Sequence, residues 1–440
     1  MAFVGWCTWL QRPNPVNLGE AKDVSLVVEH LFRHESGKMV ATLTRIFGIE
    51  HMSLAEDVVQ EALERALRTW SFYGVPENAS AWLMRVARNR ALDVVRREKS
   101  FREKEPEIVR QMEEPASGLP PGGEEEISDD RLRMMFVCCH PLLPEDVQAA
   151  LVLKTLCGFS ATEISRAFLT TEAAVAKRLT RAKQKIREAR VPFEIPTGEE
   201  LARRLEGVLQ SLYLLFNEGY KASSGEKLVR EETCFEAIRL ASLLAEHPAG
   251  NCPKTHALLA LMLLNAARFP ARVDGHGNLL LLQEQDRARW DQQRLVSGLY
   301  HLARSATGDE ISTYHLQAGI VACHCVAQDF DSTDWKNILS LYDRLLDFDH
   351  SPVVALNRAV AVANVHGPKA GLEAVAAIPD QETLESYYLY YAVLGEFESR
   401  MNEPLAAAGY FRKSLQLAQT TSERQFLSKR FQRCEEQIPA

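Results

Sequence analysis

GFSATEISRAFLTTEAAVAKRLTRAKQKIRE, residues 158–188, is the stretch that decides the fold. Residues 161–168 have the pattern of a short helix, and a turn at Leu169–Thr171 separates it from a longer helix over 172–190. Two helices joined by a turn of three to four residues are typical of a helix-turn-helix motif. The sequence therefore predicts an all-α fold with this motif in its middle.

The longer helix of the motif has two different faces. Apolar side chains at Val175, Leu179, Ala182 and Ile186 form a seam along one side. Cations on the remaining surface fit a helix that reads the major groove of DNA. The candidate contacts are Thr171, Glu172, Lys177, Arg178, Arg181 and Lys185. The alternative is a basic amphipathic helix that binds an acidic partner, and the helix and turn before it favour DNA.

A second basic helix lies upstream, in residues 24–102, which all read as helical. It begins near Asn78–Ser80 and runs SAWLMRVARNRALDVVRREK. Between Trp82 and Arg102 there are seven Lys or Arg residues against two acids. A dense cationic stripe that includes an asparagine suits phosphates and base edges, although it could also be a solubilising surface. The residues in question are Arg85, Arg88, Asn89 and Arg96.

Before this basic helix, residues 57–70 (DVVQEALERALRTW) predict an amphipathic helix. Val59, Leu63, Ala66, Leu67 and Trp70 mark its apolar side. The opposite side carries polar residues, among them Asp57, Gln60, Glu61, Glu64 and Arg65. Taken alone, this polar side is better explained as a solvated surface than as a binding face.

Charge is unevenly spread along the 440 residues, whose net charge is −8. Residues 1–102 carry +2, residues 103–130 carry −8, residues 131–190 carry +6 and residues 191–440 carry −8. The acidic total therefore does not argue against a nucleic-acid partner. Residues 103–130 are rich in Pro, Gly and Glu, which predicts a flexible linker between the first block (24–102) and the second block (131–190). Residues 1–23 form an N-terminal tail with no assigned role.

The C-terminal array, residues 191–440, is predicted to be helical throughout. Candidate helices span 199–219, 226–247, 253–268, 284–306, 312–329, 334–348, 352–366, 382–399 and 403–418. Tyr391, Leu394, Gly395, Ala407 and Phe411 fit the tetratricopeptide (TPR) template, so the array is interpreted as a TPR-like helical repeat. Stacked helix pairs form a groove that suits a protein or peptide. Alternatively, the array only packs on the two blocks.

Other classes of protein find little support. The nine cysteines form no CxxC pair, so Cys138-Cys139-His140 and Cys323-His324-Cys325 are interpreted as packing residues, with no metal and no cofactor expected. No apolar run approaches the length of a membrane span, and no signal peptide is evident, which favours the cytoplasm. No Gly-rich phosphate loop, HExxH motif or nucleophile elbow indicates an enzyme.

Taken together, AEDVVQEALERALRTW, SAWLMRVARNRALDVVRRE and the stretch quoted first resemble sigma factors of the extracytoplasmic-function group. The resemblance covers about residues 25–190. FVCCHPLLP and SLYLLFNEGY also resemble a subgroup of this family with a long C-terminal TPR-like extension. The resemblance implies a factor that directs core RNA polymerase to promoters, with no catalytic residue of its own.

The resemblance also implies roles for single residues. The face of Asp57, Gln60, Glu61, Glu64 and Arg65 would dock on the β′ clamp helices, and the second block would meet the β flap. The minus-ten element would be read and melted by the loop of residues 72–79 and by Trp82, Arg85, Arg88, Asn89, Arg96 and Arg97. The helix over 171–190 would read the minus-thirty-five element, while the acidic linker would thread the polymerase channel.

Two further expectations concern the C-terminal array. We expect it to regulate the sigma factor, and its acidic charge suggests that it folds back over the basic helices and masks them. A different reading of the chain is a helix-turn-helix regulator with a TPR-like sensor. That reading leaves the first basic block without a purpose, whereas a sigma factor requires it.

Overall fold

The computed structural model describes residues 24–97, 130–168, 170–220, 230–274, 280–418 and 420–438. Regular secondary structure in these ranges is helical and includes no β-strand, which confirms the all-α prediction. The predictions for the tail of residues 1–23 and for the linker up to residue 129 lie outside the described residues.

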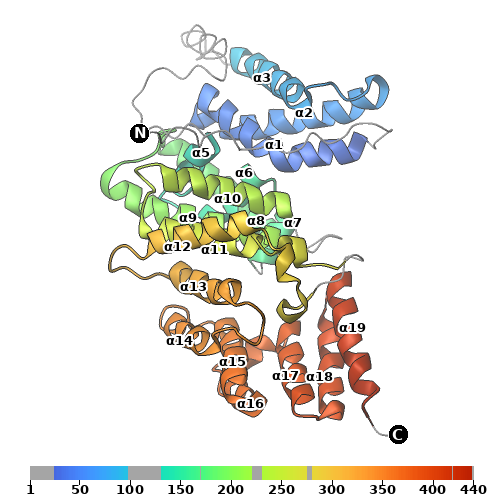
Figure 1. The fold of residues 1–440 in the computed structure, drawn as a ribbon. Coiled ribbons are helices and arrows are strands. Elements are labelled where there is room, and N and C mark those ends of the chain that lie inside the picture. The colour runs from blue at the N-terminus through green and yellow to red at the C-terminus, as the bar shows by residue number, and fades with distance from the viewer. Residues whose placement is uncertain are drawn as a thin grey trace, which may run out of the picture.

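The first block consists of three helices at the top of Figure 1. They are α1 (Val24–Phe47), α2 (Met52–Tyr73) and α3 (Ala79–Arg97), with the short 3-10 helix η1 (Ile49–His51) between the first two. Gly74 ends α2 with a φ of 81°, a backbone conformation that glycine adopts without strain. The Asn78 side chain then accepts a hydrogen bond from the Ala81 amide at 3.0 Å, so the predicted start of α3 is correct.

The second block contains the predicted helix-turn-helix. Its helices are α5 (Asp130–Cys138), α6 (Glu145–Cys157), α7 (Ala161–Ala167) and α8 (Glu172–Glu188). Gly158 ends α6 in the left-handed conformation with a φ of 68°. The Thr171 hydroxyl caps α8 by accepting from the Ala174 amide at 3.2 Å. Asp130, the last residue of the predicted linker, is already the first residue of α5.

The C-terminal array is built of paired helices. They are α9 (Gly198–Tyr220), α10 (Glu231–Glu246), α11 (Pro253–Ala266), α12 (Gln292–Ser305), α13 (Thr313–Val326), α14 (Trp335–Leu346), α15 (Pro352–His366), α16 (Pro368–Ala376), α17 (Tyr388–Arg400), α18 (Pro404–Leu417) and α19 (Thr421–Glu435). In Figure 1 they descend from the second block to the bottom of the molecule.

Several predicted helix boundaries in the array are wrong. The helix predicted over 284–306 is only α12, because Asp286 and Asp291 accept hydrogen bonds from the Ala288 and Arg294 amides and each begins a new turn. The helix predicted over 382–399 is divided into a 3-10 turn, η5 (Gln381–Leu384), and α17. Helices α5, α16 and α19 were not predicted.

One apolar core joins the two blocks to the start of the array. Buried side chains form a single cluster from Val28 in α1 to Tyr314 in α13. Helix α1 packs against α5 and α6, and α6 packs in turn against α9. The second block therefore lies between the first block and the array, as Figure 1 shows.

Candidate nucleic-acid and polymerase interface

The predicted DNA-reading face of α8 is at the surface. Its apolar seam of Val175, Leu179, Ala182 and Ile186 is buried as expected. The six candidate residues, Thr171, Glu172, Lys177, Arg178, Arg181 and Lys185, are all exposed. The Arg178 guanidinium pairs with the Asp146 carboxylate of α6 at 3.0 Å, so it must leave this partner to reach a phosphate.

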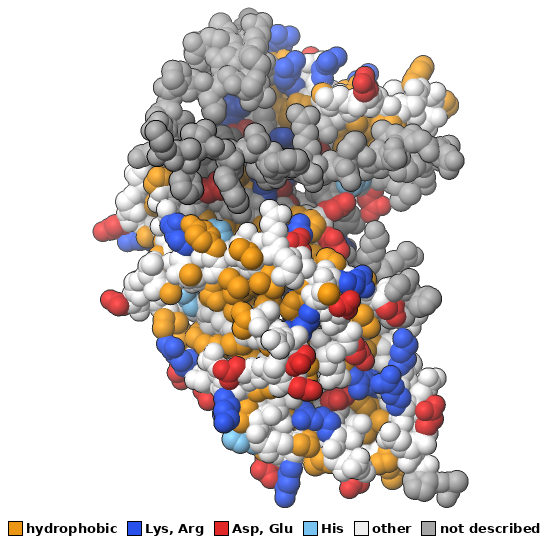
Figure 2. Space-filling view, in the orientation of Figure 1, with side chains coloured by type: hydrophobic (Ala, Val, Ile, Leu, Met, Phe, Trp, Pro, Cys, Tyr) orange, Lys and Arg blue, Asp and Glu red, His pale blue; other side chains and the backbone are white. Residues whose placement is uncertain are grey.

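The basic face of α3 is also accessible. Arg85, Asn89, Arg96 and Arg97 are exposed, whereas Trp82 and Arg88 are half-buried. The Trp82 ring meets the Trp70 ring of α2 edge-on, with centroids 5.3 Å apart, so it also holds the two helices together. Figure 2 shows Lys and Arg side chains at the surface over this part of the molecule.

Large aromatic side chains lie next to this basic face. Phe72 and Tyr73, at the end of α2, are 85% and 86% exposed. Two adjacent exposed aromatic side chains are more informative than a single exposed apolar residue, because apolar surface that is grouped often marks an interaction site. Phe72 and Tyr73 begin the loop that the sequence assigned to the melted minus-ten element, and nucleic-acid bases stack readily on exposed aromatic rings.

The polar side of α2 presents Asp57, Gln60, Glu61, Glu64 and Arg65 to solvent. The Glu61 carboxylate accepts a hydrogen bond from Arg90 Nε of α3 at 2.6 Å. Partial burial, followed by the charge of the neighbouring Glu56, raises the pKa of Asp57. The five residues therefore form one continuous acidic and polar surface beside the basic helix α3.

Sequence reasoning missed Glu56, which joins the two blocks. Its carboxylate accepts a hydrogen bond from the Thr155 hydroxyl of α6 at 2.8 Å and forms an ion pair with Lys183 of α8. These partners lie 99 and 127 residues further along the chain, so no local pattern could have paired them. Glu56 directly precedes Asp57, the first residue of the predicted polymerase-binding face.

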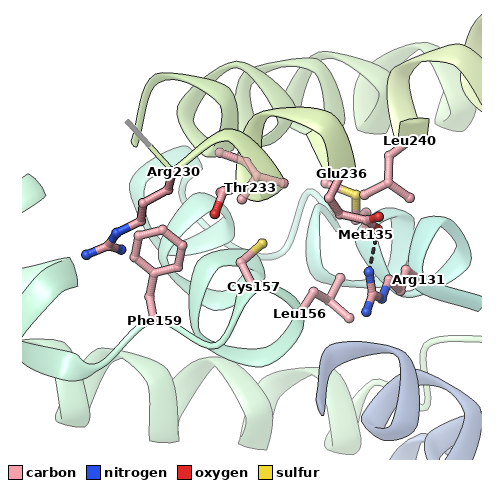
Figure 3. A pocket seen from close by; sticks show the side chains of 10 residues that line it. Arg131, Met135, Leu156, Cys157, Phe159, Arg230, Thr233, Glu236 and Leu240 are labelled. Atoms are coloured by element: carbon pink, nitrogen blue, oxygen red, sulfur yellow. Dashed lines mark hydrogen bonds and ion pairs between the residues drawn. The ribbon is translucent and has the colours of Figure 1, made fainter. Parts of the chain in front are cut away.

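The array contacts the second block on the side that faces away from the first block. A cavity of about 30 Å³ lies between α5, α6 and α10. Figure 3 shows the side chains that line it, where the Arg131 guanidinium pairs with the Glu236 carboxylate. Burial by itself would raise the pKa of Glu236, but bonds to Arg239 and the charge of Arg131 outweigh it and lower the pKa. Arg230 of the array also reaches the Glu163 carboxylate of α7 at 3.3 Å.

The expectation that the acidic array masks the basic helices is wrong for this structure. The array contacts α5, α6 and α7, whereas the cationic side chains of α3 and α8 named above remain exposed or half-exposed. The packing surfaces of the second block are apolar and adjoin α9, so burial of apolar area positions the array together with the Arg131–Glu236 and Arg230–Glu163 ion pairs.

Three cysteines of the two clusters, Cys138, Cys139 and Cys325, are buried, whereas Cys323 is half-buried. Burial raises the pKa of the Cys139 thiol to about 12. Among the described residues, no group of three or more His, Cys, Asp or Glu side chains could hold a metal ion. No described helix is both long enough and apolar enough to cross a membrane.

Comparison with known proteins identifies the class. Residues 31–101 match the family model of sigma-70 region 2, and residues 133–186 match that of sigma-70 region 4. Residues 204–306 match a family of unknown function. The chain belongs to the sigma-70 family, whose members direct RNA polymerase to promoters and are not enzymes.

Two relatives show how far the likeness extends. The chain is 38% identical over 391 residues to an uncharacterized protein of Rhizobium meliloti, covering 88% of this chain and 91% of that protein. It is 30% identical over 161 residues to the ECF RNA polymerase sigma factor SigE of Mycolicibacterium smegmatis, covering 36% of this chain and 60% of that one. No solved structure matches.

Proposed function

We propose that the chain selects promoters by dividing their two elements between its two blocks. The first block reads and melts the minus-ten element with α3 and the loop of residues 72–79, which begins with Phe72 and Tyr73. Helix α8 reads the minus-thirty-five element. The polar side of α2 docks on the β′ clamp helices of core polymerase, and the second block docks on the β flap. The observation that supports this division best is that both basic faces and the α2 face are exposed on separate helices.

Promoter opening with purified core polymerase tests the proposal. A probe base placed in the minus-ten element should become fluorescent when the full chain and core polymerase are both present. Glu64→Lys on α2 should weaken binding to core polymerase, whereas Lys177→Ala on α8 should weaken only the upstream contact. Absence of core binding by the intact chain would favour the alternative, a helix-turn-helix regulator with a sensor domain.

We further propose that the array regulates the sigma factor by holding the second block. The Arg131–Glu236 ion pair and the contact of α6 with α9 support this role, because they fix one side of the second block to the array. Gly207 of α9 packs so closely that a Cβ atom would lie 3.1 Å from Cys139 Cβ and 2.3 Å from Gln148 Oε1. Gly207→Val should therefore loosen this contact and change promoter opening, and unchanged opening would argue against a regulatory role.

The lower part of the array offers a groove for a partner. It has a volume of about 660 Å³, and most of its lining is apolar or aromatic, including Trp335, Tyr342 and Phe426. Asn357 and Asn364 lie two turns apart on α15 and line the same groove, and the Asn364 amide already donates to the Val360 carbonyl at 2.8 Å. A carboxamide pairs with a peptide unit as both donor and acceptor, so we propose that the groove accepts an extended peptide.

A peptide library displayed on phage tests the groove. Sequences selected on the intact chain should be lost when the same library is applied to Asn357→Ala or Trp335→Ala. Leu405→Ala, at a 74% exposed position outside the groove lining, is the control and should retain them. Equal recovery on all variants would show that the groove is not the binding site.

A further inference from the structure

Helix α12 of the array carries an exposed seam of uncharged side chains. Val296 and Tyr300 are 65% and 55% exposed, and Gln293 and Ala303 on the same side are also exposed. The four positions follow one another at spacings of three, four and three residues, as in helices that pack along each other. In Figure 2, hydrophobic side chains gather on the face of the array where Figure 1 places α12. The seam therefore has the pattern of a packing face at a surface position.

The seam points away from the interior of the array. Gly298, in the middle of α12, faces α11, because a Cβ atom there would lie 2.8 Å from the Leu264 side chain. Each residue of an α-helix turns the chain by about 100°, so the four seam residues lie within about 40° of the direction opposite to Gly298. Packing on α11 therefore explains the apolar residues on the Gly298 side of α12, but not those of the seam.

The charged residues of α12 do not disturb the seam. Arg294 and Arg304 are the only Lys, Arg, Asp or Glu residues of this helix. The Arg294 guanidinium pairs with the Asp291 carboxylate and lies over the Phe235 ring of α10, 4.4 Å from its centroid. Arg304 donates a hydrogen bond to the Tyr300 hydroxyl at 3.3 Å, which leaves the tyrosine ring for apolar contact. A strongly acidic or basic partner therefore finds no complement on the seam.

The seam is symmetric about the level of Gly298. In two antiparallel copies of α12 with a two-fold axis at this level, Val296 of one copy faces Tyr300 of the other, and Gln293 faces Ala303. Each copy thus offers the other the same surface, as a two-fold interface requires. Arg304 lies six residues from the axis in each copy, so the two are about 18 Å apart along the pair. This exceeds the Debye length of about 8 Å at physiological salt, so repulsion does not oppose the approach.

We propose that the seam binds the seam of a second copy of this chain, which forms a dimer through an antiparallel pair of α12 helices. The proposal does not depend on how the chain selects promoters. The 14 residues of α12 are fewer than the roughly 20–30 residues that each side of a standard stable interface supplies. Association is therefore reversible, with a Kd on the order of 10–100 µM. A helix of another protein is the competing occupant of an uncharged seam.

Sedimentation velocity of the full-length chain tests the dimer. Between about 1 and 300 µM, the weight-average mass should rise from that of one chain toward that of two. Val296→Arg places in the seam a charge that pairing would bury, and should raise the Kd more than about tenfold. Val326→Arg is the matched control, because Val326 at the end of α13 is 63% exposed and lies outside the seam. This control should associate like the unmodified chain.

Two further variants test which residues face each other. Val296→Lys and Tyr300→Glu should each be monomeric alone, because each leaves an unpaired charge at the contact. Their equimolar mixture should associate, because the antiparallel arrangement sets the lysine of one chain against the glutamate of the other. A parallel pair would bring no such charges together, so a mixture that stays monomeric would overturn the arrangement.

Other results would refute the dimer itself. These are a mass of one chain at every concentration, or equal association of Val296→Arg and Val326→Arg. A monomeric chain that loses binding to core polymerase on Val296→Arg, but not on Val326→Arg, would assign the seam to polymerase and would also refute self-association. Since both positions are exposed, the two variants should unfold at the same temperature as the unmodified chain.

Discussion

Replacing Glu236 by alanine should destabilise the contact between the second block and the array. The side chain of its partner Arg131 is only 8% exposed, so its guanidinium would remain buried without this carboxylate. Removing one partner of a buried ion pair costs about 3–5 kcal/mol, and we expect about 3 kcal/mol because Glu236 itself is 26% exposed. This loss corresponds to a change of roughly 150-fold in the unfolding equilibrium constant.

Urea unfolding followed by circular dichroism measures this loss, with Glu310→Ala at an exposed loop position as the control. The control should change the free energy of unfolding by less than about 0.5 kcal/mol. The double variant Arg131→Met/Glu236→Leu should recover much of the loss, because it removes the buried guanidinium together with its carboxylate, and Arg239, the other cation bonded to Glu236, is 41% exposed to water. If Glu236→Ala costs no more than the control, the ion pair does not hold the array in place.

The pH dependence of the free energy of unfolding provides a related measurement. The pKa of Glu236 is lower in the folded state than its ordinary value of 4.5. The stability that the ionised carboxylate contributes is therefore complete above about pH 4.5 and is lost as the pH falls through the lower folded value. Glu236→Ala should consequently lose less stability than the unmodified chain on acidification below pH 4.5.

Three other outcomes are expected. Lys177→Ala should reduce the slope of log affinity against log salt for upstream promoter DNA by about 1 and leave core binding unchanged; an unchanged slope would mean that Lys177 contacts no phosphate. Asn89→Ala should weaken promoter opening by about 5- to 150-fold if it contacts a base, and full opening would refute that contact. His301, whose Nδ1 lies 2.9 Å from His256 Nδ1, has its pKa lowered by burial to about 4, so stability should fall as the pH drops from about 6.5 toward 4. The decline over this range should be smaller in His301→Gln, and an equal decline would exclude the histidine as its cause.

Local patterns explain which parts of the molecule the sequence predicted correctly. The seam of α8 from Val175 to Ile186 follows from helical periodicity alone, so its burial and the exposure of Lys177 and Arg181 were predictable. Helix α19 was missed because its residues are strongly polar, although Thr420 and Glu423 form a capping box that marks its start.

Contacts between distant segments were not predictable in the same way. No periodicity links Glu56 with Lys183, since their pairing depends on how whole helices pack. The one local signal was Gly37 of α1, which lies against the Leu156 backbone of α6, because a glycine inside a helical pattern often marks a close approach of another backbone. The exposed aromatic pair Phe72 and Tyr73 was likewise visible in the sequence, but its exposure was not.

The core shared by α1, α6 and α9 also has a consequence for synthesis of the chain. The ribosome completes α1 at Phe47, and α6 begins only at Glu145, about 100 residues later. At about 5–20 residues per second, the side of α1 that will face α6 waits for roughly 5 to 20 seconds without its partner. During that interval the nascent chain presents an apolar helix face of the kind that chaperones bind, and a ribosome paused between the two helices would prolong the exposure.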